Sequence, residues 1–153
     1  MKVSIIAIGK DKRSSPTFQL FEEYKKRTNW NIQLKELEYK KSLPPEQLKE
    51  KEASLLLDNI DPSSIIIALD ENGKNISSEQ LASQFKTWQD EGNSSFAFLI
   101  GGAAGHGQAV LNKAHLKLSF GKLTWPHMMA RAMLAEQIYR INTIISGHPY
   151  HKS

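Results

Sequence analysis

The chain has 153 residues, of which 40% are hydrophobic and 24% charged, and its formal net charge at neutral pH is +4. This length suits a single domain over residues 1–153 with a sizeable core, and no apolar run approaches the ~20 residues needed to span a bilayer. The lack of cysteine excludes disulfides, thiolate metal sites and cysteine nucleophiles. The short apolar run at the start lacks the cleavage site of a signal peptide, so we expect a cytoplasmic protein.

Residues 2–10 (KVSIIAIGK) are almost uniformly apolar, which predicts a strand that is buried on both faces. Ser15 followed by Pro16 is typical of a helix start. A second, weaker strand is predicted at residues 32–39. The leucine-rich stretch at residues 42–60 predicts a helix, with one face made of the apolar residues Leu48, Leu55, Leu56 and Ile60.

Residues 63–70 form a strong buried strand, and the next four residues, ENGK at 71–74, predict a turn. Ser77 with Gln80 three residues later makes a capping box, which opens a helix that ends at Gly92. This segment therefore repeats the order of strand and helix seen before it.

A strand at residues 95–102 leads into a glycine-rich loop at 101–107. A short helix at 108–114, a strand at 115–120 and a closing helix from Pro126 complete the chain. Strands separated by helices, with strand interiors apolar on both faces, predict an α/β fold with a mostly parallel sheet and helices on both faces.

Ligands in such sheets bind beyond the carboxyl ends of the strands, here residues 69–71, 100–102 and 120–122. The sequence LIGGAAGHG has neither the G-x-G-x-x-G spacing of a dinucleotide site nor the G-K-[ST] ending of a phosphate loop. It indicates either a tight turn or a close approach by another backbone or a ligand, because glycine has no Cβ. Residues 120–125 can present several main-chain groups to a flat heterocycle such as adenine, or simply connect two elements.

Positive charge is concentrated towards the C-terminus. Residues 1–100 carry 14 Lys or Arg and 15 Asp or Glu, whereas residues 101–153 carry six Lys or Arg, a single Glu and all five histidines. This asymmetry favours an anionic partner such as a nucleic acid or nucleotide, with a plain solvated surface as the alternative.

On the closing helix, Glu136 and Arg140 form an i,i+4 pair, which is worth only a few tenths of a kcal/mol if exposed. The small residues and methionines of this helix suit packing on its own sheet or on a partner subunit. In the tail GHPYHKS, His148 and His151 have no third ligand nearby, so we expect no metal. The tail offers side chains for base stacking, proton handling and phosphate binding, namely Tyr150, His151 and Lys152.

Five motifs occur in order: LDENGK, SSEQLA, FLIGGAAGHG, LSFGKLTWPHMMARAMLAEQIYR and GHPYHK. With them the chain resembles, from end to end, the bacterial ribosomal RNA large subunit methyltransferase H family, which belongs to the SPOUT class of S-adenosylmethionine-dependent methyltransferases. The resemblance implies a SPOUT α/β knot, in which the C-terminal part of the chain threads through a loop to make a trefoil. It also implies a homodimer, with the active site completed by the tail of the other subunit.

The substrate that the resemblance implies is a pseudouridine in 23S rRNA, methylated at N3 within the ribosome. The cofactor contacts that it implies include the strand ends selected above. They are Leu69, Gly101, Phe120, Gly121, Lys122, Leu123, Thr124 and Trp125.

The catalytic residues that we expect are His151, Tyr150 and Arg131. His151 would accept the N3 proton or orient the base, Tyr150 would contact the base, and Arg131 would hold a phosphate. Lys152 and Arg140 are the expected RNA-binding residues, and the role of His148 stays open. Two alternatives also stay open: a SPOUT methyltransferase that modifies transfer RNA, and a non-catalytic ribosome-binding module with a vestigial pocket.

Overall fold

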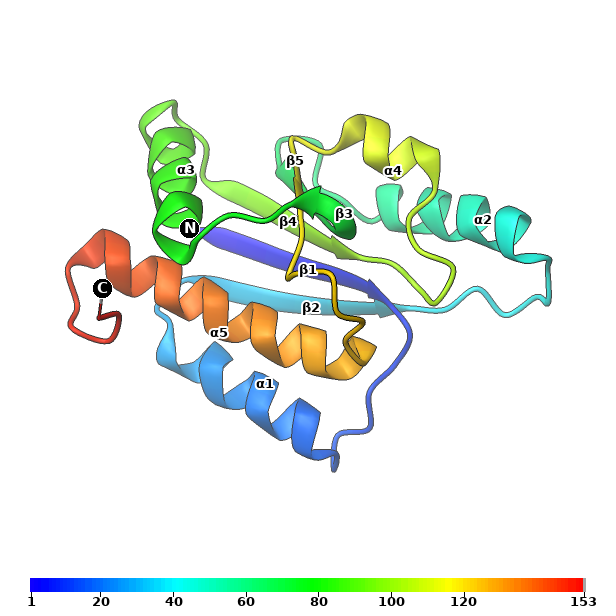
Figure 1. Cartoon of the computed structure of the whole chain (residues 1–153), viewed down its shortest axis with the longest axis horizontal. Helices are drawn as coiled ribbons and strands as arrows, with labels where there is room; N and C mark the ends of the chain where they lie inside the picture. Colours follow the sequence, from blue (N-terminus) through cyan, green and yellow to red (C-terminus); the bar gives the residue numbers. More distant parts are fainter. Residues whose placement is uncertain (153) are drawn as a thin grey trace. The chain divides into compact units, whose positions relative to one another are not determined.

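The computed structural model describes residues 1–152, which form two compact units (Figure 1). Unit 1 comprises residues 1–10, 32–75 and 95–124 and contains a β-sheet with two helices. Unit 2 comprises residues 11–31, 76–94 and the chain from Trp125 onward, and it contains three helices and the tail. Across residues 1–152, no helix combines the length and apolar character needed to cross a membrane.

The sheet of unit 1 has five strands in the order β2-β1-β4-β3-β5. The strands are β1 (Lys2–Ile8), β2 (Asn31–Leu37), β3 (Ile65–Lys74), β4 (Ser95–Ile100) and β5 (Leu116–Leu118). Both β1 and β3 pair in parallel with β4, and β5 pairs in parallel with β3. The predicted α/β fold with a mostly parallel sheet is therefore confirmed, while the trefoil knot stays a prediction.

The core of unit 1 lies between the sheet and its two helices, α2 (Pro45–Leu57) and α4 (Gln108–Lys113). These helices pack against each other, α2 also against β1 and α4 also against β3. Six consecutive residues of β1 and five of β4 are buried, as the uniformly apolar sequences predict. The core cluster consists of Ile6, Ile8, Ala53, Leu56, Ala68, Ala97, Leu99 and Val110.

The predicted turn at the ENGK sequence was wrong, because β3 continues through it. Leu69 and Lys74 both pair with Leu118, with a register irregularity between them. A Cβ on Gly73 would lie only 2.6 Å from the carbonyl carbon and oxygen of Lys117. The glycine thus allows two strands to approach closely and does not make a turn.

The buried face of α2 also differs from the predicted one. Glu52, Ala53 and Leu56 are buried, whereas Leu48 and Leu55 are only partly buried. An acidic side chain therefore lies one turn from Leu48 and one turn from Leu56, on the side of the helix that faces the core. Acidic side chains are almost never buried unless they are paired, so Glu52 requires an explanation.

Unit 2 is built from α1 (Pro16–Arg27), α3 (Ser78–Asp90) and α5 (His127–Ser146). The long helix α5 packs against both α1 and α3, and α1 lies beside it in Figure 1. The capping box at the start of α3 is confirmed, since Ser77 and Gln80 exchange both hydrogen bonds. Ser15 caps α1 by accepting a hydrogen bond from the Phe18 N–H.

Replacement of Leu99 by Ala tests the core of unit 1, because Leu99 has no exposed surface. The substitution leaves a cavity, so we expect the free energy of unfolding to fall by about 2–5 kcal/mol. Urea unfolding followed by circular dichroism measures this change. The control is Leu20→Ala, which should lose less than about 1 kcal/mol because exposed positions contribute little; Leu20 is 49% exposed. Equal losses in the two variants would contradict this assignment of the core.

Candidate functional site

The register of the sheet brings Leu69 of β3 beside the carboxyl ends of β4 and β5. Leu69 of β3 pairs with Ile100 of β4 on one side and with Leu118 of β5 on the other. Gly101 follows Ile100 directly, and Phe120 comes two residues after Leu118. Neighbouring strands lie only about 4.8 Å apart, so the main chain at these ends occupies one small area. The structure therefore gathers the three segments that the sequence singled out, although residues 69–71 lie within β3 and not at its end.

The segment after β5 is held by a buried hydroxyl. Ser119 is 5% exposed, and its Oγ accepts a hydrogen bond of 3.0 Å from the Gly121 N–H. The same Oγ lies 3.1 Å from the carbonyl oxygens of Glu71 and Gly121, and its single proton can be donated to either. Ser119 thus connects the start of this segment to the end of β3.

Beyond Ser119 the segment is open to solvent. Gly121 has φ of +103°, in the left-handed region that favours glycine, and no atom lies within 4 Å of a Cβ built on it. Lys122, Leu123 and Thr124 are exposed, Leu123 by 73%. Trp125, the last of the expected cofactor residues, is 37% exposed and begins the third segment of unit 2. An exposed main chain and an apolar side chain therefore follow the end of β5.

The glycine pair after β4 makes room for the protein itself. A Cβ on Gly101 would lie 3.1 Å from both the carbonyl oxygen of Gly105 and Nδ1 of His106. A Cβ on Gly102 would lie 2.9 and 3.1 Å from the carboxyl oxygens of Glu52. The Gly105 N–H also donates to the Gly102 carbonyl at 3.0 Å, which closes a tight turn. The loop therefore combines the two alternatives considered from the sequence, a tight turn and the close approach of another part of the chain to the glycines.

His106 is buried within this loop and is neutral. Burial lowers the pKa of its imidazole and outweighs the Leu99 and Leu69 carbonyls and the Asp70 carboxylate, which raise it. The ring Nε2 lies 3.1 Å from the carbonyl oxygen of Leu99, so Nε2 carries the proton. Nδ1 is a buried acceptor with no hydrogen-bond partner among the described residues.

Glu52 lies against the same loop and is only 7% exposed. Burial raises the pKa of its carboxyl group, and its Oε1 has no hydrogen-bond partner in residues 1–152. Sequence reasoning missed Glu52, although its four-residue spacing from Leu48 and Leu56 places it on the apolar face of α2. No comparable signal pointed to His106, because its burial depends on the fold of the loop.

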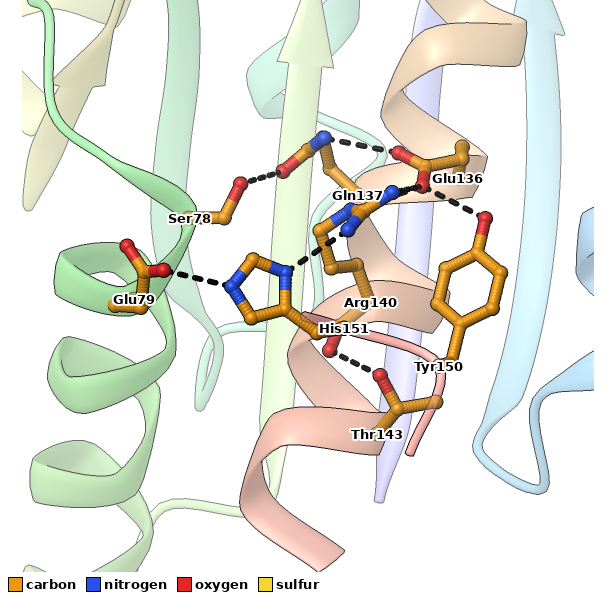
Figure 2. Close-up of polar contacts among 8 residues, drawn as sticks. All are labelled: Ser78, Glu79, Glu136, Gln137, Arg140, Thr143, Tyr150 and His151. Carbon is orange, nitrogen blue, oxygen red and sulfur yellow. Dashed lines mark hydrogen bonds and ion pairs between the residues drawn. The ribbon is translucent and has the colours of Figure 1, made fainter. Parts of the chain in front are cut away.

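The tail folds back along α5 (Figure 2). Gly147 ends the helix in the left-handed conformation, with φ of +77°, and the next N–H, from His148, donates to the Thr143 carbonyl at 2.9 Å. The Tyr150 ring packs on Tyr139, with 4.6 Å between the ring centroids. The Arg140 guanidinium lies 4.9 Å from the centre of the Tyr150 ring.

Glu136 holds both α5 and the tail. Its Oε1 accepts from Nη2 and Nε of Arg140 at 2.6 and 2.9 Å, and from the Tyr150 hydroxyl at 3.0 Å. The bond with Glu136 raises the pKa of Arg140, while burial and then the hydrogen bonds of its hydroxyl raise the pKa of Tyr150. The side chains of Arg140 and Glu136 are 26% and 16% exposed. This pair is therefore stronger than the exposed i,i+4 pair considered from the sequence.

His151 lies between α3 and α5, with both ring nitrogens engaged (Figure 2). Nδ1 is 2.8 Å from Nη1 of Arg140, and Nε2 is 2.6 Å from Oε1 of Glu79. Arginine only donates, so Nδ1 accepts and Nε2 carries a proton that it donates to the carboxylate. This hydrogen bond lowers the pKa of Glu79. Tyr150, His151 and Arg140 thus lie together, while the roles expected for them stay predictions.

Arg131 is placed differently from the tail residues. It is only 2% exposed and lies near Asp11. Burial raises the pKa of Asp11, but hydrogen bonds from Thr17 and Ser15 and the charge of Arg131 outweigh it, so the pKa is lowered. Arg131 would have to be uncovered before it reached a phosphate. Lys152 is exposed, and residues 1–152 contain no cluster of three potential metal ligands.

Comparisons with known proteins agree along the whole chain. A family model described as a predicted SPOUT methyltransferase matches residues 1–151. The chain is 46% identical over 153 residues to ribosomal RNA large subunit methyltransferase H of Rhodospirillum centenum, with 100% of both chains covered. The protein of that name from Paramagnetospirillum magneticum is 47% identical over 152 residues, with 99% of each chain covered. The protein of the same name from Clostridium botulinum strain Kyoto is 40% identical over 160 residues, with 99% of this chain and 100% of the relative covered.

Replacement of Arg140 by Gln tests how the tail is held. The variant loses the donors to Glu136 and His151, so we expect the amides of residues 148–151 to exchange with solvent about tenfold faster. Hydrogen exchange read by mass spectrometry measures this. The control is Arg27→Gln, which breaks an exposed i,i+4 pair with Glu23 and should leave the tail unchanged. Unaltered tail exchange in the Arg140 variant would show that these contacts do not hold the tail.

Proposed function

We propose, since the chain belongs to the SPOUT methyltransferase family, that it uses S-adenosylmethionine to methylate N3 of a pseudouridine in 23S rRNA. The observation that carries this proposal is the pairing of Leu69 in β3 with the ends of both β4 and β5. The name that these relatives share, ribosomal RNA large subunit methyltransferase H, supports a ribosomal rather than a transfer RNA substrate.

The residues at these strand ends fit a nucleoside cofactor. Gly101 directly follows β4, where the Gly105 carbonyl and His106 pack against it, and the segment that begins at Gly121 is open to solvent. Leu123 offers an exposed apolar surface for the flat face of an adenine. We therefore assign cofactor binding to the eight residues expected from the sequence, with main-chain groups as the principal contacts. These residues are Leu69, Gly101, Phe120, Gly121, Lys122, Leu123, Thr124 and Trp125.

S-adenosylmethionine, when bound, supplies a methyl group that is activated by a positively charged sulfur. The residues of the chain then hold the two reactants in line and provide for removal of the N3 proton of the base. Positioning of this kind is sufficient for a large rate increase and needs no covalent intermediate.

The tail is suited to hold the base. Tyr150 supplies an aromatic ring, over which the Arg140 guanidinium lies, and the exposed Lys152 offers positive charge for RNA phosphates. Arg140 would add its charge to that of Lys152 while it holds the tail through Glu136 and His151. Of the two roles considered for His151, the contacts support orientation of the base. Nδ1 accepts a hydrogen bond from Arg140, and the proton on Nε2 is donated to Glu79. While both contacts last, the imidazole has no free lone pair with which to accept a proton.

The active site that we propose is shared between the subunits of a homodimer, in which each tail serves the strand ends of its partner. The excess positive charge of residues 101–153 supports an RNA partner. A chain of 153 residues offers little surface for reading a sequence. We therefore expect it to recognise the shape of an assembled ribosome in the cytoplasm and to act poorly on short free RNA.

Replacement of Ser119 by Ala tests the cofactor site. The variant loses the hydroxyl that holds the segment after β5, so the Kd for S-adenosylmethionine should rise about tenfold in calorimetry. The control is Ser64→Ala, which removes a buried hydroxyl that bonds Ser95 where β3 and β4 begin, at the opposite edge of the sheet. The control should bind normally. If the unaltered chain binds neither S-adenosylmethionine nor its demethylated product, the non-catalytic module is the better interpretation.

Deletion of residues 150–153 tests the role of the tail. We expect methylation of intact ribosomes to fall by at least about 100-fold, because the base is no longer positioned. The affinity for S-adenosylmethionine should stay unchanged. Mass mapping of 23S rRNA after a single turnover measures the product, and near-normal methylation by the truncated chain would remove the tail from the site.

A further inference from the structure

The 101–107 loop rests on α2 at both of its ends. Near its start, Gly102 lies against the carboxyl group of Glu52. At its end, a Cβ on Gly107 would lie 2.9 Å from both Cβ of Ala53 and the carbonyl oxygen of Lys49. Consecutive residues of α2, 52 and 53, therefore support the two ends of the loop that follows β4.

Stability alone does not explain a glutamate at position 52. The side chain is 7% exposed, lies one turn from the core residue Leu56, and has an unpartnered Oε1 among the described residues. A buried polar group without a hydrogen bond costs on the order of 1–3 kcal/mol, which an apolar side chain would avoid. The second unpartnered buried acceptor of this region, Nδ1 of His106, lies against the neighbouring glycine. Two unpartnered buried acceptors next to consecutive glycines indicate a site at which the described residues do not supply every hydrogen bond.

We propose that Glu52 is a positioning residue of the methyl-donor site, which supports the 101–107 loop through Gly102 and whose Oε1 forms a hydrogen bond when the loop settles on the bound donor. The proposal rests on the proposed function, because Gly101 of this loop is an expected cofactor contact. Glu52 acts through the loop and does not touch the methyl group.

The mechanism of this support follows from space and from protonation. The carboxyl oxygens lie only 2.9 and 3.1 Å from the position that a Cβ on Gly102 would take, so the loop cannot move closer to α2 without displacing them. Because burial raises the pKa of Glu52, its carboxyl group holds its proton more readily than an exposed one does. In the neutral form it is both a donor and an acceptor, and it is able to pair with main-chain groups of the loop. Glutamine shares this property and leucine does not.

The experiment compares Glu52→Leu with Glu52→Gln. We expect Glu52→Leu to unfold at the same or a higher urea concentration than the unaltered chain, yet to bind S-adenosylmethionine about tenfold more weakly. Glu52→Gln should bind within about threefold of the unaltered chain, since an amide keeps the hydrogen-bonding groups. If Glu52 only stabilised the fold, its replacement would not raise the stability of the chain and weaken binding of S-adenosylmethionine at the same time. The control is Leu56→Met on the same face of α2, which should leave binding unchanged.

Gly102→Ala provides an independent variant, because its methyl group would displace the carboxyl group while the flexible side chain moves aside. It should weaken donor binding, and combination with Glu52→Leu should weaken binding no further. Donor binding should also slow hydrogen exchange of the loop amides in the unaltered chain and in Glu52→Gln, but not in Glu52→Leu. Normal binding by Glu52→Leu, equal losses in Glu52→Leu and Glu52→Gln, or additive losses in the double variant would each overturn the proposal. If the unaltered chain itself binds no donor, the proposed function fails, and this inference fails with it.

Discussion

The parallel pairing of β3 with both β4 and β5 is the constraint on which the proposed site depends. Because Leu69 is opposite Ile100 and Leu118, the ends of β4 and β5 lie on either side of the middle of β3, which itself continues to Lys74. Hydrogen bonds along the strands and the packing of apolar side chains on both faces fix this register, since a shift by one residue would move every side chain to the opposite face. Three segments distant in the sequence thus lie side by side, where we propose that the methyl donor binds.

The tail depends on a second, separate set of contacts within unit 2. Glu136 bonds both Arg140 and Tyr150, and Arg140 and Glu79 bond His151 from either side. A chain end of this kind usually frays unless side chains hold it. Here charge-assisted hydrogen bonds from two helices hold it, so the side chains expected to meet the RNA are arranged before any RNA binds. Pre-arrangement of this kind reduces the entropy lost on binding.

Much of the fold was predictable because the local signals agreed with the global structure. The apolar runs of β1 and β4 and the capping box at Ser77 each specify their element without help from the rest of the chain. The ENGK segment was misread because turn residues dominate it, while the close approach of Gly73 to β5 exists only in the folded sheet. Glu52 was missed for a similar reason, since its burial follows from the packing of α2. The predicted strands indicated the segments at residues 69–71, 100–102 and 120–122, but only the strand order of the folded sheet shows that they are neighbours.

A complementation experiment tests the shared active site most directly. One subunit would lack residues 150–153, and its partner would carry Leu123→Asp, which places a carboxylate where the adenine is expected. Each homodimer should be inactive, whereas the heterodimer, purified through two different tags, contains one intact set of strand ends facing one intact tail. The account predicts that the heterodimer methylates 23S rRNA in intact ribosomes at about half the rate of the unaltered protein, one site of two being complete. A heterodimer as inactive as its parents would contradict it.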